Sequence, residues 1–220
     1  MPNQRQSPAH AAIALLEPEW GDWRNMEVPK HFGAPKQEEA AIDELALADL
    51  SVLPKFGVKG PCAAAWLAES GSKVPDGVYT WTSLEEKGGR IIRTGLQEFF
   101  LEDGFTTDRV EKMIETFEPS PGVYPVIRQD AGYLLCGRLA PRVLAQTCGV
   151  NLSEPDNKVV FTRVAGVSCM LMATELEDLF TARLWCPASY GIYLWTTLLE
   201  IVHDLGGMPI GLESYEKRRL

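Results

Sequence analysis

Two segments of the chain carry apolar side chains at helical spacing. The first, TTDRVEKMIETF, places Val110, Met113, Ile114 and Phe117 at positions i, i+3, i+4 and i+7, which predicts a helix with one apolar stripe. The second, SYGIYLWTTLLEIVHDLGG, is apolar around most of its circumference. A helix of that kind is buried on more than one face, so we expect it between two halves of the protein or under a partner subunit.

The chain also contains an internal duplication. The two copies are FGVKGPCAAAWLAESG and YLLCGRLAPRVLAQTCG, and each reads as a short strand, a glycine and a helix that ends near a second glycine. Gly60 and Gly137 align, and each permits a tight turn from strand to helix. Gly71 and Gly149 stand where a residue in the left-handed conformation would end each helix. We therefore expect two halves with the same architecture.

The strands that follow these helices define the fold class. VYTWT, IIRT and QEFFLE follow the first helix, and VVFTRV, CMLMA and FTARLWC follow the second. Strands joined by hairpins form antiparallel sheets, so the pattern predicts an α+β fold of two similar strand-helix-strand-strand-helix halves. The expected boundaries are an extended N-terminal arm at 1–45, a first half at 46–122, a second half at 123–210 and a polar tail at 211–220.

The N-terminal arm carries two tryptophans within EPEWGDWRNMEVP. Trp20 and Trp23 bury a large area only where they meet another surface, so the arm either wraps its own domain or docks on a partner chain. Both tryptophans are therefore interface candidates. Tyr193 and Trp195 are two more, because the helix that carries them has more apolar surface than one packed face needs.

Composition limits the classes of partner. Thirty acidic against 21 basic residues give a formal net charge of -9, which disfavours nucleic acid and anionic lipid as partners. The apolar run AAIALL near the start is too short for a signal peptide core and for a membrane span. We therefore expect a cytoplasmic protein with no membrane partner.

Histidine and cysteine placement gives no metal-binding motif. The three histidines are far apart in sequence and form no HxxxH or HExxH pattern, so we expect no metal site. The cysteines are odd in number, lack a CxxC pair and mostly lie in apolar surroundings, which favours buried free thiols. They are Cys62, Cys136, Cys148, Cys169 and Cys186.

The order of features in the first half resembles the glycine-cleavage T-protein (aminomethyltransferase) superfamily. ADLSVLPKFGVKGPCAAAWL is similar to the opening element of that family, a D-x-S followed by a strand, a V-x-G-P and a helix. MEVPKHFG, EEAAIDEL and ADLS follow one another as in the family's amino-terminal segment, and the likeness covers residues 17–102. The resemblance implies a T-protein-like fold, shortened because 220 residues leave no room for the family's further barrel domain.

The second half resembles a narrower group. IRQDAGYLLCGRLAPRVLAQTCGVNL, FTRVAGVSCMLM and RLWCPASYGIYLWTTLLEIV are similar to the gamma subunit of heterotetrameric sarcosine oxidase and of related N-methyl-amine dehydrogenases. In that group a strand ending in a small residue and a serine leads into a long helix with tyrosine and tryptophan. Ala188, Ser189, Tyr190, Tyr193 and Trp195 match this pattern.

One position departs from the T-protein pattern. In that family the glycine turn is followed by an acidic pair, one carboxylate of which lies beside the folate, whereas this chain has GGRIIRT with Arg90 and Arg93. A guanidinium cannot act as a base, so we expect no catalytic residue in this chain. The two arginines lie on a solvated strand edge, pair with acids of a neighbouring subunit, or bind the glutamate tail of folate as cofactor-binding residues.

The resemblance implies a non-catalytic or weakly catalytic gamma-like subunit of a hetero-oligomeric complex that oxidises and demethylates N-methyl amines. Its expected partners are larger oxidoreductase and T-protein-like subunits, which would bind flavin and tetrahydrofolate. The alternative is a stand-alone tetrahydrofolate-binding, aminomethyltransferase-like protein whose missing carboxylate is supplied by Glu102 or Asp103. Candidate amine substrates include sarcosine, N-methylglutamate and dimethylamine.

Overall fold

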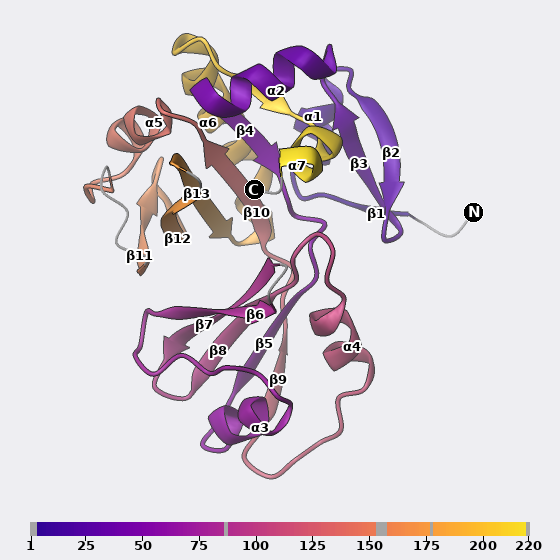
Figure 1. The fold of residues 1–220 in the computed structure, drawn as a ribbon, viewed down its shortest axis with the longest axis vertical. Coiled ribbons are helices and arrows are strands. Elements are labelled where there is room, and N and C mark those ends of the chain that lie inside the picture. The colour runs from indigo at the N-terminus through magenta and orange to yellow at the C-terminus, as the bar shows by residue number, and fades with distance from the viewer. Residues whose placement is uncertain (1–3, 86–87, 153–157, 177, 219–220) are drawn as a thin grey trace. The chain divides into compact units, whose positions relative to one another are not determined.

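The computed structural model describes residues 4–85, 88–152, 158–176 and 178–218. Glu86 and Lys87, in the expected glycine turn, lie outside the described residues. The chain divides into two compact units, and it enters and leaves the second unit between parts of the first (Figure 1). The first unit consists of Met1–Val52, Asp130–Asp156 and Val160–Leu220, and the second of Leu53–Gln129 and Asn157–Val159.

The second unit is built on a five-stranded sheet with strand order β6-β7-β8-β5-β9, in which neighbouring strands are antiparallel. Phe56 and Leu101 of the sheet form a core with Leu67 of one helix and Val110 of the other, so both helices pack against the same face. Its elements in chain order are β5 (Lys55–Lys59), α3 (Ala63–Glu69), β6 (Trp81–Glu85), β7 (Gly88–Gly95), β8 (Glu98–Glu102), α4 (Arg109–Glu115) and β9 (Tyr124–Ile127).

The first unit contains a six-stranded sheet, order β11-β12-β13-β10-β4-β14, and a three-stranded sheet, order β1-β3-β2. Its strands are β1 (Arg5–Gln6), β2 (Glu19–Trp23), β3 (Met26–His31), β4 (Ala46–Asp49), β10 (Ala131–Cys136), β11 (Val159–Val164), β12 (Val167–Leu176), β13 (Leu179–Cys186) and β14 (Met208–Ile210). Its helices are α1 (His10–Ala14), α2 (Pro35–Glu44), α5 (Ala140–Thr147), the 3-10 helix η1 (Ala188–Tyr190), α6 (Gly191–Asp204) and α7 (Leu212–Arg218).

The core of the first unit lies on one face of the six-stranded sheet. Alternate residues along a strand point to the same face, and Tyr133 of β10 and Leu184 of β13 belong to this buried cluster. Three helices contribute to the same cluster, through Ile13 of α1, Val143 of α5 and Trp195 of α6. The expectation that α6 is buried on more than one face is wrong. Its buried residues, among them Leu194, Leu198 and Val202, line one side of the helix, and Ile192, Thr196 and Glu200 on the other side are exposed.

The predicted α+β class and the internal duplication are confirmed. Each half has three strands after its first helix, as the strand segments indicated, rather than the two of the strand-helix-strand-strand-helix order. The second unit runs β5-α3-β6-β7-β8-α4, and the first unit repeats this order as β10-α5-β11-β12-β13-α6. Gly60 and Gly137 have φ values of 124° and 106° at the equivalent strand-to-helix turns. A Cβ at either position would come within 2.6 Å of backbone atoms, so both turns require glycine.

Two smaller predictions about helix ends differ from the structure. Gly71 adopts the expected left-handed conformation with φ 80°, but Gly149 does not, since the chain is already extended at Cys148, the residue after the end of α5. Helix α4 ends at Glu115, so Phe117 lies beyond it, where its ring packs against Phe56. The expected apolar stripe is therefore shorter than the pattern indicated.

The N-terminal segment is not an extended arm. Residues 1–45 contribute α1, α2 and the three-stranded sheet to the first unit, in which β1 pairs in parallel with β3. The expected polar tail at 211–220 also differs, since α7 buries Leu212 and Tyr215 and only Glu216–Arg218 at its described end are exposed. The compact units are therefore divided at 52/53 and 129/130 rather than near 45 and 122.

Candidate functional site

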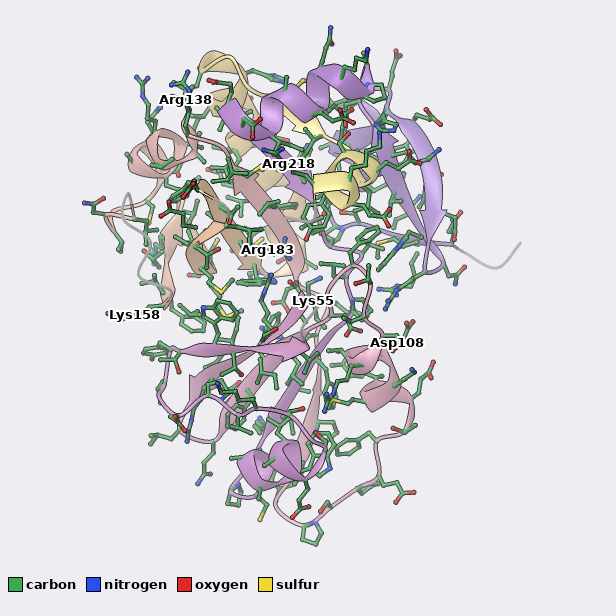
Figure 2. All side chains as sticks on the ribbon, viewed as in Figure 1. Lys55, Asp108, Arg138, Lys158, Arg183 and Arg218 are labelled. Atoms are coloured by element: carbon green, nitrogen blue, oxygen red, sulfur yellow. The ribbon has the colours of Figure 1, made fainter. Side chains whose placement is uncertain are left out.

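The residues that follow the glycine turn lie on β7, beside the central strands of the second unit. Strand β8 lies between β7 and β5, and the register places Arg90 and Lys55 on opposite sides of Glu102 (Lys55 is labelled in Figure 2). Arg90 Nη1 is 3.1 Å from Glu102 Oε1, and Lys55 Nζ is 3.8 Å from Glu102 Oε2. Glu102 is fully buried, so this row is a carboxylate held between two cations inside the unit.

The geometry of this row limits what Glu102 can do chemically. Lys55 is itself buried and also donates a hydrogen bond of 2.8 Å to the carbonyl oxygen of Leu53. The two cations stabilise the negative charge of the buried carboxylate, and Arg90 donates a hydrogen bond to one of its oxygens. Glu102 therefore balances charge within the sheet and is poorly placed to accept a proton from a substrate.

Asp103, the other expected substitute carboxylate, holds the start of α4. Its Oδ1 accepts hydrogen bonds from the Val110 backbone N–H at 3.0 Å and the Thr107 hydroxyl at 3.1 Å. Its Oδ2 accepts from the Glu111 backbone N–H at 3.2 Å. The first N–H groups of a helix have no partner within the helix, so a buried aspartate that accepts from them caps the helix from outside. Asp108, the residue before α4, makes no such side-chain bond.

Arg93 connects three parts of the second unit. Its Nη1 donates to the carbonyl oxygens of Asp76 at 2.9 Å and Pro75 at 3.3 Å, and its Nη2 donates to that of Leu96 at 2.7 Å. The guanidinium carbon lies 5.4 Å from the centre of the Phe99 ring. These contacts indicate that Arg93 holds a loop and a hairpin turn on the sheet. A role for Arg90 or Arg93 in binding folate or a neighbouring subunit stays a prediction.

Of the four expected interface aromatics, Trp195 is in the core. Its side chain is 0% exposed, with its ring 5.6 Å from that of Tyr133 and 6.4 Å from that of Phe32, so it offers no surface to a partner. The apolar pattern of α6 does not by itself distinguish its packed side from its open side. Tyr193 is 55% exposed, and its hydroxyl donates to the Ala165 carbonyl oxygen at 3.2 Å.

The contacts of the two N-terminal tryptophans lie within the first unit. They favour the first of the two predicted alternatives, in which the N-terminal segment packs on its own domain. Trp20 packs against the core of the first unit, with its ring 4.8 Å from that of His10. Trp23 is partly exposed, and the guanidinium of Arg24 lies 4.4 Å from the centre of its ring. Docking of Trp20 and Trp23 on a partner stays a prediction.

Sequence reasoning missed a buried polar cluster in the first unit, which we call the Glu38 cluster and define as His31, Glu38, Glu213 and Ser214. Glu38 Oε2 accepts a hydrogen bond of 2.6 Å from the Ser214 hydroxyl, and His31 Nδ1 is 3.4 Å from the same oxygen. His31 Nε2 is 3.0 Å from Glu213 Oε2. No local sequence motif indicates this cluster, because its members are up to 183 positions apart.

Backbone groups complete the environment of Glu38. Its Oε1 accepts from the N–H groups of Phe32 at 2.5 Å and Gly33 at 3.3 Å, and its Oε2 accepts from that of Gly211 at 2.9 Å. Ser214 and Glu38 are both fully buried, so a substrate cannot reach the serine in this conformation. The Glu38 cluster therefore joins β3, α2 and α7 and does not present a nucleophile.

The D-x-S element of the first half also has a structural function. Asp49 Oδ1 accepts from the Ser51 backbone N–H at 2.9 Å and the Ser51 hydroxyl at 2.5 Å, and the other oxygen bonds the hydroxyl of Ser7. Ser51 Oγ in turn accepts from the backbone N–H of Gly132 at 3.0 Å. These bonds attach the N-terminal segment and β10 to the end of β4.

In the part of the chain that the structure describes, His, Cys, Asp and Glu side chains form no group of three or more that could hold a metal ion. Of the helices described, none is long and apolar enough to cross a membrane.

The chain is similar to aminomethyltransferases in sequence, and it shares their fold. No family model matches the chain. The aminomethyltransferase of Thermoanaerobacter pseudethanolicus strain ATCC 33223 is 23% identical over 239 residues, and that of Thermoanaerobacter sp. strain X514 is 22% identical. Each alignment covers 100% of this chain and 64% of the relative, so the chain spans less than two thirds of the length of these curated proteins.

Two solved structures share the fold. The glycine cleavage system aminomethyltransferase T of Bartonella henselae superposes with a TM-score of 0.71 at 16% identity, covering 99% of this chain and 62% of that one. A chain of the heterotetrameric sarcosine oxidase of Corynebacterium sp. U-96 superposes with a TM-score of 0.64 at 19% identity, covering 92% of this chain and 97% of that one. The predicted resemblance to both groups is confirmed at the level of the fold.

Proposed function

We propose that this chain is a non-catalytic or weakly catalytic small subunit of a hetero-oligomeric complex that oxidises and demethylates N-methyl amines. It would correspond to the gamma subunit of sarcosine oxidase and act in the cytoplasm. Its partners would be larger oxidoreductase and T-protein-like subunits, which bind the flavin and tetrahydrofolate. The match that covers 97% of a chain from a heterotetrameric sarcosine oxidase supports this proposal.

The proposal rests on one observation: Glu102 and Asp103, the two carboxylates near Arg90, are both engaged in structural contacts. Transfer of an aminomethyl group requires an anion that can take a proton or stabilise a cationic intermediate. Glu102 is buried between Lys55 and Arg90, and Asp103 accepts the first N–H groups of α4. Either carboxylate could act on a substrate only if these contacts broke. This supports a non-catalytic or weakly catalytic role for the chain within the complex.

A half-exposed apolar surface at the start of α6 supports association with another subunit. Tyr190, Ile192 and Tyr193 are each about half exposed. Large apolar side chains grouped on a surface are typical of protein interfaces. In the proposal, this surface contacts a larger subunit.

The proposal is tested by recovering the tagged chain from its native cells under mild conditions and identifying retained proteins by mass spectrometry. We expect a flavoprotein with the absorbance of bound flavin, and about tenfold less of it with Tyr193→Asp, because a charge at an interface hot spot weakens binding. Leu96→Asp, at an exposed apolar position of the other unit, is the matched control and should not reduce recovery. Recovery of the chain without any flavoprotein would contradict the proposal.

The competing function is a stand-alone tetrahydrofolate-binding transferase, which the whole-chain alignment to curated aminomethyltransferases favours. Calorimetric titration of the purified chain with tetrahydrofolate distinguishes the two. Micromolar binding that is lost in Arg93→Ala would favour the transferase and the predicted contact of Arg93 with the folate tail. An absence of binding up to millimolar tetrahydrofolate is the result expected for the subunit.

A further inference from the structure

Two cysteines lie opposite one another on neighbouring strands in the first unit. In the antiparallel register of β12 and β13, Met170 faces Trp185 and Leu171 faces Leu184. One step further along the same register places Cys169 opposite Cys186. The two thiols also share a side-chain hydrogen bond, so their sulfur atoms are neighbours.

This arrangement fits the geometry of a disulfide. Residues directly opposite in an antiparallel pair have Cα atoms roughly 4.5 to 5.5 Å apart, and disulfides span Cα separations of roughly 4.4 to 6.8 Å. Cys169 and Cys186 both belong to the core cluster on the helix-covered face of the sheet. Their side chains therefore point the same way, and a bond between them requires no change of strand register.

The shared hydrogen bond makes the two thiols chemically unequal. The bond with Cys186 lowers the pKa of Cys169, while the same bond and burial raise the pKa of Cys186. Thiolate is the reactive form of cysteine, so the direction of these shifts favours Cys169 as the thiol that reacts first. The register of β12 and β13 places Cys186 where it can complete a disulfide.

The position of the pair gives a route for a small oxidant. Cys186 is the last residue of β13 and is followed by Pro187, and Cys169 lies near the start of β12, after a turn in which Ala165 and Gly166 have φ values of 49° and 82°. Strand ends open more easily than strand centres, so a small molecule can reach these buried sulfur atoms during local opening.

We propose that Cys169 and Cys186 form a redox site that hydrogen peroxide converts to a disulfide across β12 and β13. The Cys169 thiolate attacks one peroxide oxygen and breaks the O–O bond, which gives a sulfenic acid and, after proton uptake, one water. The Cys186 sulfur then attacks the Cys169 sulfur and displaces the hydroxyl as a second water. Two thiols are oxidised by two electrons, one peroxide is reduced to two waters, and a dithiol reverses the bond.

The other cysteines lack this arrangement. Cys62 is exposed and lies in the second unit, and Cys148 contacts the hydroxyl of Thr162 at 3.7 Å. Cys136 is buried in β10, and burial raises the pKa of its thiol to about 12. A disulfide formed in the folded protein should therefore join Cys169 and Cys186 selectively.

The test uses the full chain carrying Cys62→Ser, reduced and then treated with hydrogen peroxide under native conditions. After the peroxide is removed, thiols are counted in denaturant and disulfide-linked peptides are mapped by mass spectrometry. We expect the thiol count to fall from four to two, with one linked peptide joining Cys169 to Cys186, and to return to four after treatment with a dithiol reductant. Four thiols retained in the folded protein, or a different linkage, would overturn the proposal.

Two further variants separate the pair from general oxidation. In Cys186→Ser, Cys169 should stop at the sulfenic acid and be trapped by a dimedone-type reagent. Cys136→Ser is the matched control, since it removes a buried cysteine of the same sheet and should leave the Cys169–Cys186 linkage intact. Circular dichroism verifies that each variant is folded before it is compared. The mapping in the chain carrying only Cys62→Ser tests the redox pair even if a further variant does not fold, and it is independent of the proposed subunit function.

Discussion

Glu38 in the first unit and Glu102 in the second are both fully buried carboxylates, and the two units accommodate them in different ways. Glu38 accepts hydrogen bonds from three backbone N–H groups and a serine hydroxyl, which are neutral donors, and the imidazole of His31 lies 3.4 Å from its Oε2. Glu102 lies between two cations, Lys55 and Arg90. One charge is therefore stabilised by fixed dipoles and the other by opposite charge.

The difference has consequences for how each unit is connected. The donors of Glu38 come from parts of the chain as far apart as Phe32 and Ser214, so this carboxylate ties the C-terminal helix α7 to the N-terminal part of the unit. The partners of Glu102 are its cross-strand neighbours, so that carboxylate connects three strands that are already paired. Loss of Glu38 should release a segment, whereas loss of Glu102 should leave buried positive charge.

The largest expected effect is that of Glu102→Gln. The amide keeps the shape of the side chain but leaves Lys55, which is buried, without its anionic partner. Removal of one member of a buried ion pair costs about 3 to 5 kcal/mol, and we expect the free energy of unfolding of the second unit to fall by that amount. Urea unfolding followed by circular dichroism measures it.

Glu98→Gln on the same strand is the matched control for that substitution. Glu98 is exposed, so its replacement should change the free energy of unfolding by less than about 0.5 kcal/mol. Adding Lys55→Met to Glu102→Gln removes the cation whose charge Glu102 balances, and it should restore part of the loss. If Glu102→Gln is as stable as the control, the carboxylate does not balance Lys55 and Arg90.

A smaller loss is expected for Glu38→Gln. The amide NH₂ group cannot accept hydrogen bonds. It would replace either Oε2, which accepts from Gly211 and Ser214, or Oε1, which accepts from Phe32, so at least one buried donor would lose its acceptor. An unsatisfied buried donor costs about 1 to 3 kcal/mol, and we expect about 2 to 3 kcal/mol for this change. Hydrogen exchange should show faster exchange of the α7 amides, which distinguishes release of the helix from general destabilisation. Protection of α7 equal to wild type would contradict the connecting role of Glu38.

The next effect concerns pH and acts through Glu213 at the edge of the Glu38 cluster. Hydrogen bonds with Lys30 first, and then with His31, lower the pKa of Glu213 below its ordinary value. A depressed carboxylate pKa stabilises the fold above the unfolded pKa of about 4.3, and the contribution is lost as pH falls through the folded pKa. Because Glu213 is 43% exposed, screening keeps its contribution at neutral pH below about 1 kcal/mol.

Unfolding curves of wild type and Glu213→Gln between pH 3 and pH 7 measure this contribution. The difference in free energy of unfolding between the two proteins should be constant at neutral pH and shrink below about pH 4.3. The other titratable groups at this position are Lys30, His31 and Glu38, with Glu19 on the far side of Lys30, and they are identical in both proteins. A difference that grows in acid would mean that the pKa of Glu213 is raised in the folded protein.

Local signals in the sequence predict some parts of the fold, and pairings between distant residues determine the others. The duplication was predictable because Gly60 and Gly137 mark equivalent turns at which a Cβ would meet the backbone. The apolar spacing that predicted α4 is a local signal of the same kind. The N-terminal sheet was missed, since the parallel pairing of Arg5 with Met26 leaves no local period in so short a strand.

The candidate site was predictable only in part. The arginines after the glycine turn could be located, but their partners depend on strand register, which sets Arg90 opposite Glu102. The Glu38 cluster was not predictable, because it joins a helix near the start of the chain to Ser214, 176 positions later. Trp195 was placed on a surface because apolar spacing on α6 does not reveal which side packs.

The smallest expected effect is that of Lys217→Ala, which tests whether α7 depends on the Glu38 cluster or on its surface charges. Lys217 Nζ lies 3.1 Å from Glu39 Oε1, but the two side chains are 58% and 46% exposed. Exposed ion pairs contribute about 0.2 to 1 kcal/mol and are weakened by salt, so we expect a loss of about 0.3 kcal/mol that disappears in 1 M sodium chloride. Urea unfolding at low and high salt measures this difference. A loss equal to that of Glu38→Gln would mean that surface pairing, not the buried carboxylate, holds α7 in place.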